Sequence, residues 1–326
     1  MKFLAVLITF AINHFWKRDR YALDDRWFFR FRDWLAGQTH RHDDAPGKNA
    51  WLFLAVLLLL PTVLLALLLW LLDGLLWGLP VFLIHLALLL TLFGHSNIAA
   101  VTARYLQSWR SANYESALHQ LQQHRQQLAL DNSDNHERLH QEFCRFLVAD
   151  YFQRVFAVVF WYLLLGPAAA LFYHLALQCR ERVWSNASTE EMELVARLVY
   201  WLEWLPARLL AGTFTLAGDF VAVFSCLRDS VFDRDRSAES LVHSCALAAI
   251  NADRKAVLVQ ESQIPDAESS EQAVTAVVLE ADEAIGEGAF RLRCARQVTE
   301  ILELMQRSQI VWLTLLALLT LHEIIV

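Results

Sequence analysis

The sequence predicts an all-α integral membrane protein with about six membrane-embedded helices. Of its 326 residues 56% are hydrophobic and only 10 are Gly and 6 Pro, a balance that is unusual for a water-soluble protein of this length. Several apolar runs approach the roughly 20 residues that a helix needs to cross the hydrocarbon core. Tryptophan indoles favour the headgroup region. Tryptophans lie at or near the ends of these runs, at Trp16, Trp51, Trp70, Trp77 and Trp312.

We expect one membrane domain over 1–326. The first apolar run ends in a charged patch without a small-residue cleavage site, so we interpret it as an uncleaved membrane helix and not as a signal peptide. Pro61 and Gly166-Pro167 predict kinks in the second and fourth helices. The expected helices are approximately 1–16, 51–72, 79–93, 155–177, 194–226 and 310–326, with cytoplasmic loops at 17–50, 94–154 and 227–309.

The count of basic residues decides the orientation, because Lys and Arg concentrate on the cytoplasmic side. The 17–50 loop holds eight of them and 94–154 holds about six. Without a crossing at 194–226, all 13 basic residues of 178–309 would lie outside. With it, nine of them return to the cytoplasm in 227–309. The charge distribution therefore predicts six crossings with both termini outside.

The crossing at 194–226 is also the most informative segment, because it carries charges in an apolar run. It follows Ser188 and Glu191, a cap residue three positions before a Glu. Pro206 removes a backbone donor within it and predicts a kink, and neighbouring helices can satisfy the carbonyl that this frees. On an unbroken helix, residues 11 apart lie about 20° from one face. This spacing aligns Arg197, Arg208 and Asp219.

Ionisable side chains at membrane depth normally face a bundle interior, a partner charge or a water-filled cavity. One interpretation is an anion-binding intramembrane cavity in which Arg208 supplies a fork of donors to phosphate or carboxylate. A second is that the charges only pair between helices. A third is two interfacial helices that meet at Pro206, with every charge reaching to water. The candidate ligand-binding residues are Arg208, Trp204, Pro206, Arg197, Asp219, Glu203, Arg104 and His95.

Other classes of function leave no trace in the sequence. It has no Gly-rich phosphate loop, nucleophile elbow or H-E-x-x-H motif, so we name no catalytic residue and no metal ligand. Five cysteines without C-x-x-C pairing predict free thiols. No basic stripe suggests nucleic acid as a partner, and the expected partner is the lipid bilayer.

The string LEWLPARLLAGTFTLAG (202–218) resembles the W-x-P-A-R-L segment of the membrane-protein family that includes CobD/CbiB and AmpE. VFAVVFWYLLLGPAAALFYHLAL (155–177) resembles a second segment of that family, and both ends of the chain resemble AmpE in particular. Within the motif, Trp204, Pro206, Ala207, Arg208 and Leu209 match position by position. The L-L-G-D-P…H-P opening of the CobD/CbiB synthases is missing.

The resemblance implies a multi-pass protein of the bacterial inner membrane that modulates β-lactamase induction, with a link to muropeptide recycling and the AmpD amidase. In this interpretation the chain has no cofactor, is not an enzyme, and senses an anionic or cell-wall-derived ligand through the Arg208 cavity. The alternative is a membrane amide ligase related to adenosylcobinamide-phosphate synthase. It would use nucleotide and Mg²⁺, with Asp150, Asp219 or Glu203 near the metal.

Overall fold

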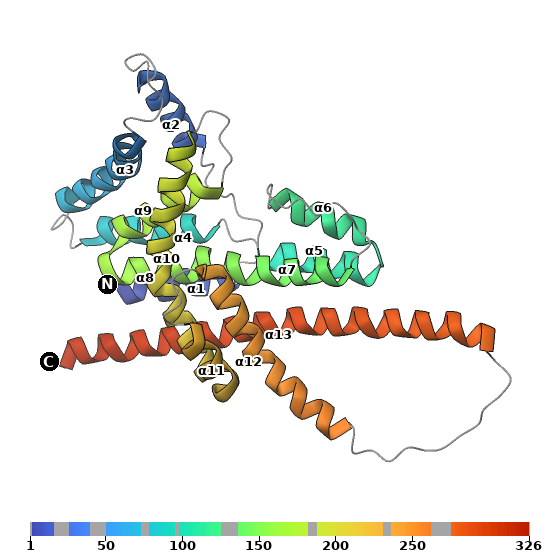
Figure 1. The fold of residues 1–326 in the computed structure, drawn as a ribbon. Helices are drawn as coiled ribbons and strands as arrows, with labels where there is room; N and C mark the ends of the chain where they lie inside the picture. Colours follow the sequence, from blue (N-terminus) through green and yellow to red (C-terminus); the bar gives the residue numbers. More distant parts are fainter. Residues whose placement is uncertain are drawn as a thin grey trace. The chain divides into compact units, whose positions relative to one another are not determined.

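The computed structural model describes residues 2–15, 26–39, 50–72, 78–94, 98–124, 136–181, 188–230, 236–261 and 275–325 (Figure 1). This part of the chain is all-helical and contains no strand, as the sequence predicts. It forms two compact units. The first comprises residues 1–97, 150–209 and 313–326, and the second comprises 98–149 and 210–312. Whether they make up one membrane domain stays a prediction.

Three helical stretches of the described chain are long and apolar enough to cross a membrane: Ala50–Leu72, His136–Leu165 and Gly288–Leu318. The first of these matches the expected crossing 51–72 closely. The expected crossings 1–16 and 79–93 form shorter apolar helices, and 194–226 is not among the three long apolar stretches of the described chain. Six crossings therefore stay a prediction, although the chain has the apolar helices of a membrane protein.

The first unit contains the strongly apolar helices α3 and α4 and a small core. Helix α3 contacts α9 and α2, and α4 contacts α1 and α9. The core side chains come from α2, α3, α9 and α10, and include Phe28, Leu57, Leu175 and Val199. The bounds are α1 Lys2–Phe15, α2 Arg26–Thr39, α3 Ala50–Leu72, α4 Leu79–Gly94, η2 Phe152–Phe156, α8 Ala157–Leu165, α9 Pro167–Glu181 and α10 Thr189–Ala217.

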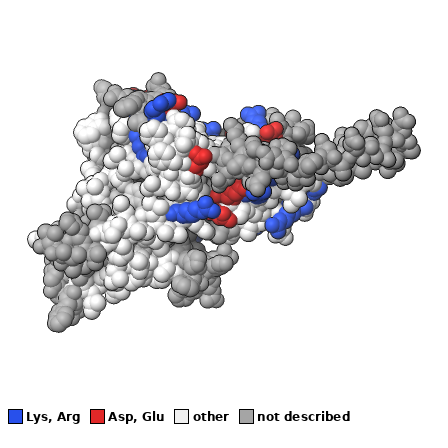
Figure 2. Space-filling model, turned by 90° about the horizontal axis from the view of Figure 1, so that it is seen from below, with Lys and Arg blue, Asp and Glu red and all other residues white. Residues whose placement is uncertain are grey.

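Much of the apolar surface of α3 points away from this core. Only 22% of its apolar window is buried, and Val63, Leu67 and Leu71 are all more than half exposed. Such a contiguous apolar surface is unfavourable in water and is typical of a helix in contact with lipid. Figure 2 agrees, because broad areas of the face it shows carry no described Lys, Arg, Asp or Glu side chain.

Two expected crossings are each interrupted by a glycine. The run 155–177 ends one helix at Leu165 and begins the next at Pro167, because Gly166 has a positive φ of 95° that stops α8. Pro167 then takes the first position of α9, where its missing N–H costs nothing. The run 194–226 is likewise wrong as a single helix, since α10 ends at Ala217 and α11 begins at Phe220.

The second unit is built on aromatic packing between α5 and α7. The Tyr105 ring stacks on Phe143 with centroids 3.5 Å apart, and Trp109 is fully buried beside them. Helix α5 also packs on α6, and α11 packs on α12. The bounds are α5 Ile98–Arg110, α6 Tyr114–His124, α7 His136–Tyr151, α11 Phe220–Ser230, α12 Ala238–Glu261 and α13 Thr275–Ile325. Helices α7, α10 and α13 each contribute residues to both units.

Candidate functional site: the charged segment of helix α10

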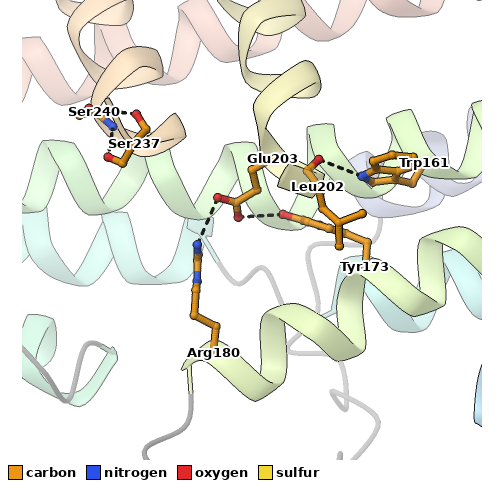
Figure 3. Close-up of polar contacts among 7 residues, drawn as sticks. All are labelled: Trp161, Tyr173, Arg180, Leu202, Glu203, Ser237 and Ser240. Atoms are coloured by element: carbon orange, nitrogen blue, oxygen red, sulfur yellow. Dashed lines mark hydrogen bonds and ion pairs between the residues drawn. The ribbon is translucent and has the colours of Figure 1, made fainter. Parts of the chain in front are cut away.

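A carboxylate is buried in the apolar interior of the first unit. Glu203 on α10 is only 2% exposed. Its Oε2 lies 3.2 Å from Nη1 of Arg180, and the hydroxyl of Tyr173 donates to its Oε1 at 3.2 Å (Figure 3). A buried carboxylate needs both a counter-charge and hydrogen bonds to offset its lost hydration. Glu203 has both.

Helix α9 positions both partners of Glu203. Tyr173 and Arg180 are seven residues apart, so they lie within about 20° of each other around the helix. Arg180 is in the last turn, where a positive charge also compensates the helix dipole. Replacing a buried ion pair by apolar residues is often neutral or stabilising, so packing alone does not explain this cluster. An ionisable group at membrane depth is by default a candidate functional group.

Pro206 creates a second polar requirement one turn further along α10. Because proline has no N–H, the carbonyl of Leu202, four residues earlier, loses its helical hydrogen bond. Nε1 of Trp161 on α8 donates to this carbonyl at 3.2 Å (Figure 3). The neighbouring helix thus satisfies the freed carbonyl, as the sequence predicts. Helix α10 is continuous across Pro206, and the expected kink stays a prediction.

Arg208 is held by its own helix. Its guanidinium lies over the ring of Trp204, 4.0 Å from the centroid, and Nη1 donates to the Trp204 carbonyl at 3.1 Å. A guanidinium stacked on an indole is held in a defined plane. The side chain is half-buried. Arg208 is therefore a pre-oriented cation at the border of the apolar interior.

Further ion pairs tie the ends of α9 and α10 to the first unit. Glu181, next to Arg180, accepts from Arg154 at 3.0 Å, and Arg154 also bonds Asp150 at 2.6 Å. At the start of α10, the Ser188 hydroxyl caps the helix by accepting from the Glu191 N–H, which confirms the expected cap. The Glu191 carboxylate pairs with a buried Arg32 at 2.8 Å. Ion pairs thus hold the end of α9 and the start of α10.

Three of the remaining candidate residues are described by the structure, each at a different element. Arg197 is exposed on α10. Asp219 follows the end of that helix and accepts from the Ala222 N–H at 2.8 Å, so it caps α11. The expected stripe of three charges on one unbroken helix is therefore wrong at Asp219. Arg104 is an exposed residue of α5 whose Nε donates to its own helix, and His95 lies outside the described residues.

The family comparison decides the identity of the chain. A family model for the "Regulatory signalling modulator protein AmpE" matches residues 1–281. The chain belongs to the AmpE family. With its three apolar helices, this AmpE-family chain is a membrane protein with a signalling-modulator role. Neither a curated protein nor a solved structure matches it.

The carboxylates named for a Mg²⁺-dependent ligase are each engaged by other groups of this AmpE-family chain. Asp150 bonds Arg154, Glu203 bonds Arg180 and Tyr173, and Asp219 caps α11. Within the described residues, no three His, Cys, Asp or Glu side chains are grouped as a metal site. No contact of these residues favours the ligase alternative over a signalling role.

The second unit contains a cavity of about 610 Å³ that was not predicted from the sequence. Nδ1 of His140 is hydrogen-bonded to the Tyr105 hydroxyl at 3.2 Å, and its Nε2 to Oε1 of Gln297 at 3.3 Å. Sγ of the buried Cys144 lies 3.5 Å from the same Nε2. Burial, with the Arg145 charge, lowers the pKa of His243, and its Nε2 has no hydrogen-bond partner among the described residues. The lining residues are Glu137, His140, Gln141, Cys144, His243, Leu247, Phe290, Arg293, Cys294 and Gln297.

Proposed function

We propose that this AmpE-family chain modulates β-lactamase induction from the bacterial inner membrane, as a multi-pass protein linked functionally to muropeptide recycling and the AmpD amidase. We further propose that the charged segment of α10 binds an anionic or cell-wall-derived ligand at Arg208. The family match over residues 1–281 supports the regulatory role. The orientation of Arg208 by Trp204 is the observation that supports the ligand site.

The electrostatic arrangement favours an anion over a cation at this segment. The only acidic side chain among residues 197–209 is Glu203, and Arg180 already balances its charge. The guanidinium of Arg208 is planar and stacked on Trp204, so its plane is already set and little side-chain entropy is lost when a carboxylate or phosphate binds. Partial burial strengthens such a contact, because the surrounding dielectric is lower than in water.

The proposal is tested by β-lactamase induction in cells whose only AmpE-family protein is this chain. Arg208→Ala removes the guanidinium, whereas Arg208→Lys keeps a charge without the planar fork. Arg228→Ala is the matched control, because Arg228 is 72% exposed on α11. Membrane abundance of each variant is measured in parallel.

We expect Arg208→Ala to shift the inducer concentration for half-maximal β-lactamase several-fold, Arg208→Lys to shift it partly, and Arg228→Ala to leave it unchanged. The membrane abundance of Arg208→Ala, measured in parallel, should equal that of the wild-type chain. An unchanged induction curve for Arg208→Ala, at normal abundance and over several inducers, would contradict the ligand-binding role.

A further inference from the structure

Two cysteines of the second unit face each other across a helical hairpin. The thiol of Cys245 on α12 donates to Sγ of Cys226 on α11, and the two sulfur atoms are 3.3 Å apart. Both are free thiols in this structure. A disulfide requires sulfurs about 2.05 Å apart, so a small movement of two side chains would suffice to form the bond.

The surrounding packing holds the two thiols in register. Helices α11 and α12 are packed on each other. Gly218, before Cys226, approaches Ala249, beyond Cys245, so closely that a Cβ on Gly218 would lie 2.7 Å from the Ala249 Cβ. This order of contacts is that of an antiparallel hairpin. At the start of α12, Ser237 accepts from the Ser240 N–H at 3.3 Å and fixes the first turn (Figure 3).

The two thiols differ in their exposure to solvent, and this difference sets the order in which they react. Cys226 is half-buried and lies two residues before Arg228, which is 72% exposed. Cys245 is fully buried, and burial raises the pKa of its thiol. Small oxidants therefore meet Cys226 first, and Cys245 is placed to react with the product. The other cysteines are buried at Cys144, Cys179 and Cys294.

We propose that Cys226 and Cys245 are a modification site, at which a peroxide produces a reversible disulfide between α11 and α12. The Cys226 sulfur attacks one peroxide oxygen, the O–O bond breaks, and water leaves while Cys226 becomes a sulfenic acid. The Cys245 sulfur then attacks the Cys226 sulfur, and its proton leaves with the sulfenic hydroxyl as a second water. Two thiols are oxidised by two electrons and one peroxide is reduced to two waters.

The modification closes a covalent loop from residue 226 to residue 245 and joins the two helices of the hairpin. Reduction by a thiol reverses it through exchange. The proposal does not involve Arg208, and its test measures no β-lactamase. Its failure would therefore leave the proposed function unaffected.

The experiment uses the purified full chain in detergent, treated with hydrogen peroxide, blocked with N-ethylmaleimide and digested with trypsin without reduction. Cleavage after Arg228 and Arg236 puts the two cysteines on different peptides. We expect a linked peptide pair whose mass is lower by two hydrogens than the sum of its parts, and which dithiothreitol separates. The melting temperature should rise on oxidation by on the order of 5 °C.

Cys226→Ser and Cys245→Ser should each abolish the linked pair, while Cys144→Ser should leave it unchanged. The presence or absence of the linked pair in the wild-type chain tests the proposal even where a variant fails to fold. The proposal is overturned if the folded wild-type chain gives no linked pair and Cys226 stays reduced or proceeds to sulfinic acid. A pair that forms only after unfolding would overturn it equally.

Discussion

Removing the counter-charge of the buried Glu203 should destabilise the first unit strongly. In Arg180→Met the carboxylate keeps the Tyr173 hydroxyl but loses its ion pair at 3.2 Å. Breaking one side of a buried pair typically costs about 3–5 kcal/mol. Because Arg180 is 25% exposed, water screens part of the interaction, and we expect about 2–3 kcal/mol.

The double variant Arg180→Met/Glu203→Gln separates a charge effect from a packing effect. The Gln amide has no charge to compensate and its oxygen still accepts from Tyr173, so most of the loss should be recovered. The assay is reversible unfolding of the purified chain in mixed micelles, with Arg228→Met, from an exposed pair, as the control. The ion pair would have no stabilising role if Arg180→Met cost less than about 0.5 kcal/mol, or if the effects of Arg180→Met and Glu203→Gln simply added in the double variant.

Three further predictions concern other contacts. Trp161→Phe removes the donor to the Leu202 carbonyl and should cost about 1–2 kcal/mol in thermal unfolding, and an unchanged melting curve would show that this bond contributes nothing. Gly218→Ala should cost about 1–3 kcal/mol by overpacking. Gly212→Ala, whose Cβ would meet no described atom within 4 Å, should instead stabilise helix α10 by about 0.5–1 kcal/mol, and equal effects of the two changes would contradict this. The lowered pKa of His243 favours the neutral ring on folding, so stability is complete above the ordinary value of 6.5 and falls as the pH drops toward the folded-state pKa. His243→Gln should reduce this slope, and a pH profile of unfolding identical to wild type would exclude the role.

Local sequence signals predicted the features of the structure that depend on few residues. The apolar run at 51–72 forms a helix long enough to cross a membrane. Ser188 caps α10, since the hydroxyl and the N–H that it bonds are only three residues apart. The missing N–H of Pro206 implied that a neighbour must satisfy the Leu202 carbonyl. The sequence could not identify Trp161 as that neighbour, because 41 residues separate the two groups.

The rest of the site depended on contacts between helices or on a signal that was overlooked. Glu203 does not share the spacing of Arg197, Arg208 and Asp219, so its partner had to come from elsewhere. Only the fold brings Arg180 and Tyr173 to it. The pair Gly218-Asp219 is a glycine that ends one helix followed by a cap residue that begins the next. This signal predicts that Arg208 and Asp219 lie on different helices. Apolar composition concealed this break, because hydropathy continues across it.

Native mass spectrometry of the purified chain tests most directly whether the segment at Arg208 binds an anionic ligand. If Arg208 binds such a ligand, we expect the added mass of a phosphate- or carboxylate-bearing compound on the wild-type chain and on Arg228→Ala, and no added mass on Arg208→Ala. An unliganded wild-type chain, or an adduct equally present on Arg208→Ala, would contradict it.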